Sequence, residues 1–398
     1  MAAEPSGALP DAAIAADAAV VADAAAARVG AYVHVPFCRR VCPYCDFAVV
    51  AGREDLAERY VDALRAEIGA AAPFPGPLDA VFVGGGTPSR LSPEALGRVL
   101  QAVEERCGLG PGAEVSLEAN PEDWSPSVAA GLRAAGFNRV SLGAQSFDPG
   151  VLSALGRRHR PGQAEEAVAV ARSAGFASVN LDLIYGTPGE SAASWATSVE
   201  RALATGCDHL SAYALTVELG TALSRAIAAG APAPDPDRQA EKWEAAAGLA
   251  AAAGLARYET SNFARPGLAC LYNLITWAQG EYEGFGAGAH RHRAGTRSWN
   301  LRRVDRYLAL IEAGEPSTAG EERLGPWERE QERLVLGLRR AAGVVAGEGG
   351  RALLESAAGQ RLVGAGVLER AGDRLRVARP LLGDEAARAV LALEGRDC

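Results

Sequence analysis

Between residues 31 and 218, short β-rich runs alternate with helical patterns, and this alternation limits the possible folds more than any other feature. The β-rich runs span residues 31–37, 78–86, 114–120, 139–146, 178–186 and 209–218, and the helical patterns span 56–70, 92–106, 125–136, 161–175 and 191–206. Repeated βα units predict an α/β protein with a parallel sheet and right-handed crossovers. Six units are too few for an eight-stranded barrel, so a partial barrel and a doubly wound sheet both fit.

We expect the chain to consist of three parts. Residues 1–28 form an Ala-rich extension, which has no basic residue before Arg28 and resembles neither a signal peptide nor a transit peptide. Residues 29–300 are predicted to form the sheet and helices with an extension, which includes a linker at 219–239 and a long helix at 241–254. Residues 301–398 are expected to form a smaller, mostly helical domain with a small hairpin that includes a strand near 374–380.

Net charge and cysteine usage argue against several classes of protein. The formal net charge of −9 argues against a general nucleic-acid binder. No apolar run is long enough to predict a membrane span. The seven cysteines are an odd number with a single cluster, which argues against a secreted disulfide scaffold and favours a reducing, cytoplasmic location.

Polar residues and glycines gather where the predicted strands end. The carboxyl ends of parallel strands share one edge of a sheet, and binding sites in such folds lie at that edge. The residues at or just after these ends are Cys38, Gly84, Gly85, Gly86, Thr87, Glu118, Gln145 and Asp182. The sequence therefore predicts a binding site at this edge.

Three cysteines, Cys38, Cys42 and Cys45, stand in a C-x3-C-x2-C pattern directly after the first strand. Cysteine thiolates hold iron–sulfur clusters, and three of them on one loop can bind three irons of a cubane and leave the fourth iron open to a small molecule. A structural zinc site needs four ligands, usually as two separated pairs, and the sequence offers no second pair. We therefore predict a [4Fe-4S] cluster, with a zinc knuckle as the alternative.

The pattern resembles the radical S-adenosylmethionine (SAM) family. The segments YVHVPFCRRVCPYCDF, GGGTPS, LEANP, SLGAQSF, LGRRH and NLDLIYGTPG resemble, in this order, the branch that contains oxygen-independent coproporphyrinogen III oxidases and HemW-type haem chaperones. The resemblance covers about residues 30–300 and implies a partial (β/α)6 radical SAM barrel. It also implies that the open iron binds SAM and that an electron donor reduces the cluster, which cleaves SAM to a 5′-deoxyadenosyl radical.

The resemblance, together with side-chain chemistry, implies roles for individual residues. Tyr32 would flank the bound SAM, and Phe47 would meet the adenine. The turn formed by Gly84, Gly85, Gly86 and Thr87 would meet the methionyl amine. Glu118 offers a carboxylate to the ribose hydroxyls or to an ammonium group, and Gln145, Arg157 and Asp182 offer an amide, a guanidinium and a second carboxylate. Each of these residues, taken alone, also suits an ordinary polar position at the end of a strand.

Phe47, Tyr272 and Thr276 bear on the choice between the oxidases and the HemW-type proteins of this branch. Phe47 stands where the oxidases have a further cysteine and HemW-type proteins have Phe. HemW-type proteins also carry H-N-x-x-Y-W, tied to haem binding, whereas this chain has Tyr272 in place of the His and Thr276 in place of the Tyr. Tyrosinate can ligate ferric haem, so Tyr272 is a candidate ligand; the alternative is that it only packs beside the barrel.

The later GFGAGAHRHR run is similar to one in HemW-type proteins, which implies that His290 lines the barrel mouth; a metal pair with His292 is an alternative.

Three functions therefore stay open. The first is a HemW-type chaperone that binds a cluster, SAM and haem and delivers the haem to an acceptor protein. The second is an anaerobic coproporphyrinogen III oxidative decarboxylase, which Phe47 disfavours. The third is a radical SAM enzyme for another substrate, which Tyr272 and Thr276 favour. We predict the first, with no catalytic residue assigned.

Overall fold

The computed structural model describes residues 24–74 and 76–394. Residues 1–23 of the predicted Ala-rich extension lie outside the described residues. The described part opens with a short 3-10 helix, η1 (Ala25–Ala27), and the side chain of Ala25 is buried. Further short 3-10 helices are η2 (Glu54–Leu56), η3 (Pro88–Arg90), η4 (Pro121–Asp123) and η5 (Pro380–Leu382).

A sheet of parallel strands forms the centre of the molecule, and its strands follow one another in space as they do in sequence. They are β1 (Val29–Val35), β4 (Leu78–Gly85), β5 (Leu109–Ala119), β6 (Arg139–Gln145), β7 (Ser178–Tyr185) and β8 (His209–Ala214). A doubly wound sheet would reverse its strand order, and here the order from β1 to β8 does not reverse. The predicted partial barrel is confirmed, and the doubly wound alternative is wrong.

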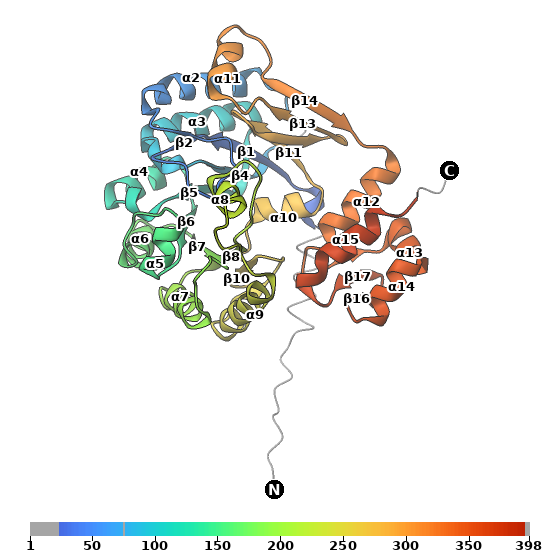
Figure 1. Ribbon diagram of the computed structural model, residues 1–398. Helices are drawn as coiled ribbons and strands as arrows, with labels where there is room; N and C mark the ends of the chain where they lie inside the picture. Colours follow the sequence, from blue (N-terminus) through green and yellow to red (C-terminus); the bar gives the residue numbers. More distant parts are fainter. Residues whose placement is uncertain (1–23, 75, 395–398) are drawn as a thin grey trace.

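Helices cover the outer side of this curved sheet (Figure 1). They are α2 (Ala57–Ala70), α3 (Pro93–Cys107), α4 (Pro126–Ala134), α5 (Pro149–Ala154), α6 (Gly162–Ser173), α7 (Ala192–Ala204) and α9 (Pro236–Ala252). Ser92, Ser125 and Ser191 cap three of these helices, because each side chain accepts a hydrogen bond from the first turn. The main hydrophobic core lies between the strands and these helices.

The sheet is wider than the six predicted strands, because short strands extend both of its sides. Beyond β8 lie β10 (Asn262–Ala264) and β9 (Ala256–Arg257), which are antiparallel. Beyond β1 lie β11 (Glu281–Phe285), which is parallel to β1, and then the antiparallel β12 (His290–Arg293), β13 (Thr296–Asn300) and β14 (Thr318–Arg323). The order β14-β13-β12-β11-β1-β4-β5-β6-β7-β8-β10-β9 makes twelve strands in one sheet among the described residues. Helix α11 (Val304–Glu312) connects β13 to β14.

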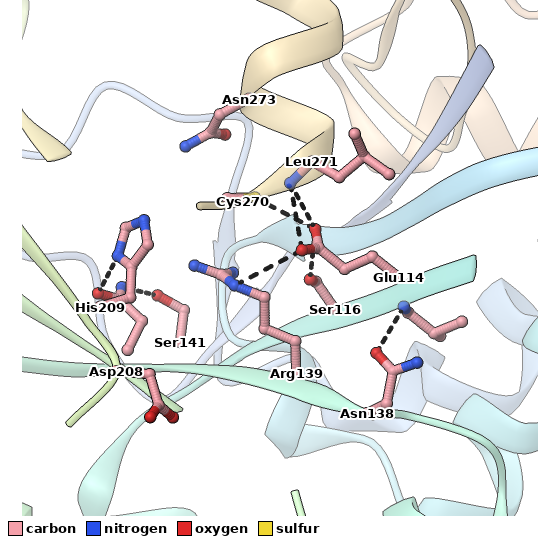
Figure 2. Close-up of polar contacts among 12 residues, drawn as sticks. Glu114, Ser116, Asn138, Arg139, Ser141, Asp208, His209, Cys270, Leu271 and Asn273 are labelled. Carbon is pink, nitrogen blue, oxygen red and sulfur yellow. Dashed lines mark hydrogen bonds and ion pairs between the residues drawn. The ribbon is translucent and has the colours of Figure 1, made fainter. Parts of the chain in front are cut away.

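Helix α10 (Leu271–Trp277) lies against β1, β4 and β11, and a buried polar cluster holds its first turn (Figure 2). The carboxylate of Glu114 accepts hydrogen bonds of 3.1 Å from the backbone N–H of Leu271 and of 3.4 Å from the thiol of Cys270. The same carboxylate lies 4.0 Å from the guanidinium of Arg139, which is 2% exposed. Buried charges require such partners, so Glu114 joins the start of β6 to the start of α10.

The last part of the chain forms a separate small unit with its own core. Its elements are α12 (Pro326–Gly337), β15 (Val344–Val345), α13 (Gly347–Glu355), α14 (Ala357–Gly364), β16 (Leu368–Ala371), β17 (Arg374–Val377) and α15 (Gly383–Leu391). The three strands pair antiparallel in a small sheet. The predicted division at residue 301 stays a prediction; α11 and β14 pack with the large sheet, and the small core begins at Leu334.

Among the described residues, no helix is long and apolar enough to cross a membrane.

Candidate functional site

A closed loop carries the three cysteines at the carboxyl end of β1. The loop begins at β2 (Phe37–Cys38) and ends at β3 (Val50–Ala51), and these two short strands pair in parallel. Within the loop, the backbone N–H of Cys45 donates to the carbonyl oxygen of Cys42 at 3.1 Å. The strand pair fixes both ends of the loop, so the three side chains are presented from a short, constrained segment.

The three thiols are free and half-buried, and two of them lie beside Thr87, which follows β4, and Arg157, which follows α5. Sγ of Cys38 lies 3.7 Å from the hydroxyl of Thr87, and Sγ of Cys42 lies 4.0 Å from the guanidinium of Arg157. Burial raises the pKa of the Cys38 thiol to about 11, although the hydroxyl of Thr87 opposes the shift. Burial also raises the pKa of Cys45. Without a bound cation the thiols of Cys38 and Cys45 are therefore protonated at neutral pH.

The thiols do not form a site for one metal ion. In the described residues, no three His, Cys, Asp or Glu side chains are grouped as ligands of a single ion. Zinc requires its ligands around one centre, whereas each thiolate of a cubane binds a different iron. The donor set of three thiols on one loop thus fits the predicted cluster better than the zinc alternative.

The turn after β4 leaves no room for side chains. Gly85 has φ of +113°, and a Cβ at this position would lie 2.5 Å from Nδ1 of His34. A Cβ on Gly86 would lie 2.7 Å from the carbonyl carbon of Pro36. A Cβ on Gly84 would lie 3.0 Å from Oε2 of Glu118. The missing side chains let the backbone of this turn lie directly against the base of the cysteine loop.

Glu118 lies near the end of β5, and its side chain contacts this turn. Its carboxylate accepts a hydrogen bond of 3.0 Å from the backbone N–H of Gly85. Burial raises the pKa of Glu118 to about 7, and the negative charge of Asp182 adds to the rise, while the Gly85 N–H opposes it. Near neutral pH this carboxyl group is therefore partly protonated; it can hydrogen-bond a hydroxyl group, and a cation placed beside it would favour its ionised form.

The raised pKa of Glu118 predicts a pH-dependent stability. A carboxyl group with a folded pKa of about 7, above its ordinary 4.5, favours folding below pH 4.5, and this contribution is lost as the pH rises through 7. Between pH 5 and pH 8, the free energy of unfolding of the cluster-free wild type is expected to fall by about 1–3 kcal/mol more than that of Glu118→Gln. The glutamine side chain of the variant does not titrate. Urea unfolding at both pH values measures this difference. Glu312→Gln, at an exposed ion pair with Arg59, keeps Glu118 and is the control that should follow the pH profile of the wild type. Equal pH profiles for wild type and Glu118→Gln would contradict the prediction.

A strained segment at the end of β6 brings Gln145 and Arg157 together. Gln145 has φ of +63°, which is costly for a residue with a side chain. A Cβ on Gly143 would lie 2.8 Å from the amide nitrogen of Gln145 and 3.2 Å from the guanidinium of Arg157. The guanidinium of Arg157 donates to the carbonyl oxygen of Gly143 at 2.9 Å and to the side chain of Asn120. Asn120 in turn donates to the hydroxyl of Thr87 at 3.1 Å.

Two residues that matter for this geometry were not among the predicted site residues. Asn120 links Thr87 to Arg157 and so connects the ends of β4 and β5 to the segment that follows α5. His34 bridges the first strand and the cysteine loop, because its Nε2 lies 2.8 Å from the carbonyl oxygen of Ala48 and its Nδ1 lies 3.2 Å from the hydroxyl of Tyr32. Burial lowers the pKa of His34 to about 4. The one sequence signal for Asn120 is its place at the end of a predicted strand.

Asp182 belongs to a polar network inside the barrel. Its carboxylate accepts hydrogen bonds from Ser141 at 2.7 Å and from the amide of Asn180 at 2.8 Å. The carbonyl oxygen of the Asn180 side chain lies 2.6 Å from Nδ1 of His209, whose Nε2 lies 2.9 Å from the hydroxyl of Tyr258. Asp182 is thus held by its own neighbours, and its charge acts on Glu118 through space. Its role toward a ligand stays a prediction.

Tyr32, Phe47 and Tyr272 line a different part of the site. They border a pocket of about 560 Å³ on the β1 and β11–β13 side of the sheet. The ring of Tyr272 lies between those of Tyr32, Phe82 and Tyr282, with centroids 5.6–6.1 Å apart. Phe47 is 61% exposed. Gly85 and the end of the cysteine loop line the same pocket, so the aromatic residues adjoin the polar side of the site; the roles of all of these residues stay predictions.

Comparisons with known proteins indicate the family and the fold of the chain. The family model described as Radical SAM superfamily matches residues 32–202. The protein named heme chaperone HemW of Mycobacterium tuberculosis strain H37Rv is 44% identical over 372 residues, which are 91% of this chain and 94% of that protein. The protein of the same name in Bacillus subtilis is 36% identical over 79% of this chain and 84% of its own length. The structure of coproporphyrinogen III oxidase from Escherichia coli matches 94% of this chain and 92% of that chain with a TM-score of 0.78 and 22% identity, which indicates a common fold.

Proposed function

The chain belongs to the radical SAM superfamily and, within it, to the HemW family, and on this premise we propose that it is a haem chaperone of the HemW type. In this proposal it binds a [4Fe-4S] cluster, SAM and haem, and passes the haem to an acceptor protein. Its partners are haem, the acceptor and an electron donor for the cluster. In this proposal the protein acts in the cytoplasm, where the thiols of Cys38, Cys42 and Cys45 stay reduced.

The observation that supports this proposal most directly is the position of Phe47. This residue lies two positions beyond the last cysteine of the loop, is 61% exposed and lines the aromatic pocket. The loop that would hold the cluster therefore also forms a wall of a pocket whose aromatic lining suits a flat ring, and in this proposal Phe47 meets the adenine of SAM there. A cysteine at this position would give the pocket a thiol instead of a ring.

Each cofactor has candidate ligands in the chain. Cys38, Cys42 and Cys45 would hold the cluster, the backbone of Gly84, Gly85 and Gly86 with Thr87 would hold the methionyl end of SAM, and Glu118 would bind its ribose. When bound, the cluster and SAM supply one-electron chemistry. The chain's own contribution is to position these groups. Gly85 and Glu118 fix each other by a hydrogen bond, and Arg157 and Asn120 hold the hydroxyl of Thr87 close to the thiol of Cys38.

Haem titration of the anaerobically reconstituted protein tests the proposal. We expect a saturable change of the Soret band with an endpoint near one haem per chain and with no decarboxylated porphyrinogen formed under reducing conditions with SAM. Formation of decarboxylated product from coproporphyrinogen III would contradict the chaperone assignment and support the oxidase alternative. The absence of any saturable Soret change would also contradict it and would support a radical SAM enzyme for another substrate.

A further inference from the structure

The segment of residues 272–282 joins the aromatic pocket to the small C-terminal unit. It runs from α10 through a turn to the second residue of β11. Its two ends carry Tyr272 and Tyr282, which both line the pocket and whose ring centroids lie 5.9 Å apart. Helix α10 contacts both the sheet and α12 of the small unit (Figure 1). The segment therefore has both of its ends at the pocket and its middle at the small unit.

The ring of Tyr272 is packed so closely that it must follow any movement of α10. A Cβ on Gly30 would lie 3.1 Å from Cδ2 of this ring. The ring centroids of Tyr32 and Phe82 lie 6.1 Å and 5.6 Å from that of Tyr272. Close-packed side chains transmit a displacement to their neighbours, because no free volume absorbs it. A shift of α10 therefore changes the position of a pocket wall.

Gln279 holds the turn of this segment to the small unit. Its side-chain amide donates to the carbonyl oxygen of Arg329 at 3.0 Å and to the carboxylate of Glu332 at 2.7 Å, and both of these residues lie on α12. The backbone of Gln279 has φ of +58°, which is uncommon for a residue with a side chain. Such a conformation persists only where the surroundings fix it. The two hydrogen bonds to α12 are contacts that can fix it.

Two further contacts connect the same segment to the small unit. The guanidinium of Arg339 lies 5.5 Å from the ring centroid of Trp277, at the end of α10. The carboxylate of Glu332 also pairs with Arg297 of β13. Burial raises the pKa of Tyr282, and the negative charge of Glu332 adds to the rise, while the charge of Arg297 opposes it. Glu332 thus acts both on the turn and on the second tyrosine of the pocket.

We propose that Gln279 is a positioning residue, through which segment 272–282 couples the small unit to the pocket, so that binding of SAM and docking of the small unit strengthen each other. This inference rests on the proposed function and deepens it, because it assigns a regulating contact to the cofactor pocket. A ligand that packs against Tyr272 and Tyr282 restricts both ends of the segment, so the turn loses less freedom when it holds α12. Coupling between two sites is reciprocal, so loss of the contact at the turn weakens binding in the pocket.

Gln279→Gly tests the effect of the turn on the pocket, because glycine adopts φ of +58° without strain and the variant loses the side-chain contacts with α12. In the protein with its reconstituted cluster, we expect the dissociation constant of SAM in equilibrium dialysis to rise roughly fivefold or more, with unchanged iron content. Gln331→Ala is the matched control, since Gln331 also lies on α12 but donates to Val390 and Leu393 within the small unit. Unchanged affinity in Gln279→Gly, or an equal loss in both variants, would overturn the inference.

Hydrogen exchange tests the reverse effect, of the pocket on the small unit. The backbone N–H of Ala341 donates to the carbonyl oxygen of Tyr258 at 2.9 Å across the contact between the two units, so its exchange rate reports on docking. Saturating SAM should slow this exchange roughly fivefold or more in the wild type, and the slowing should be lost in Gln279→Gly. A response to SAM that persists in the variant would show that Gln279 is only structural and would overturn the inference. Wild-type protein that holds its cluster but binds no SAM would contradict the proposed function itself, whereas SAM binding without any change at Ala341 would contradict only the coupling.

Discussion

Cys38→Ala is expected to abolish binding of the iron–sulfur cluster. The loop carries three cysteines, and the other described free cysteines, Cys107, Cys207 and Cys270, are buried elsewhere in the fold. Loss of one thiolate leaves two irons of the cubane without a protein ligand, so we expect chain-bound iron to fall by more than about tenfold. Iron and sulfide content after anaerobic reconstitution, together with the visible absorption of the cluster, measures this loss.

Cys107→Ala is the matched control for this experiment. Cys107 is a free, buried cysteine at the end of α3 and lies outside the loop. The replacement removes one thiol from the chain but none from the site, so its iron content should equal that of the wild type. Wild-type iron content in Cys38→Ala, or an equal loss in both variants, would show that the loop does not hold the cluster through Cys38.

Glu114→Ala is expected to lower the free energy of unfolding by about 3 kcal/mol or more. The replacement leaves the guanidinium of Arg139 buried without its carboxylate, and it removes the acceptor for the backbone N–H of Leu271 (Figure 2). Breaking one side of a buried ion pair costs about 3–5 kcal/mol, because the remaining charge stays desolvated. Urea unfolding at neutral pH measures the change.

Two further variants separate the cause of this loss from general damage. Glu58→Ala breaks an exposed pair with Arg98, in which the side chains are 70% and 40% exposed, and it should cost less than about 1 kcal/mol. The double variant Glu114→Leu, Arg139→Met removes both charges and should recover part of the stability that Glu114→Ala loses. If Glu114→Ala costs no more than Glu58→Ala, the buried pair is not what fixes α10 to the sheet.

The sequence predicted the repeating part of the fold well. Six strands and five helices lie within a few residues of their predicted positions, because hydrophobic periodicity and serine caps are local signals. The predicted sixth strand is too long, since β8 ends at Ala214, and the third is too short, since β5 begins at Leu109. The predicted linker contains a helix, α8 (Ala222–Ala228), whose Leu223 N–H donates to the carbonyl oxygen of Pro43 in the cysteine loop.

The short flanking strands could not be predicted in the same way. Strands β9 to β14 have two to six residues each, and they exist because a neighbouring strand is available for pairing. Short strands of this kind have little pattern of their own, and their propensity depends on context. The same reason explains why the sequence did not show that β11 continues the parallel sheet beyond β1.

What the sequence determined by itself is the chemistry of one loop and the period of the fold. The spacing of Cys38, Cys42 and Cys45 and the βα repeat are local patterns, and they were sufficient to predict a three-thiolate donor set and a parallel α/β sheet. The choice of a partial barrel over a doubly wound sheet came from the resemblance to the radical SAM family. Only the tertiary structure decided what surrounds that loop. Tyr32, Tyr282 and Trp299 are far apart in the chain, and they line one pocket because β1, β11, β12 and β13 pair side by side. Strand pairing at long range, which follows from burial and hydrogen bonding of the whole sheet, cannot be read from local spacing.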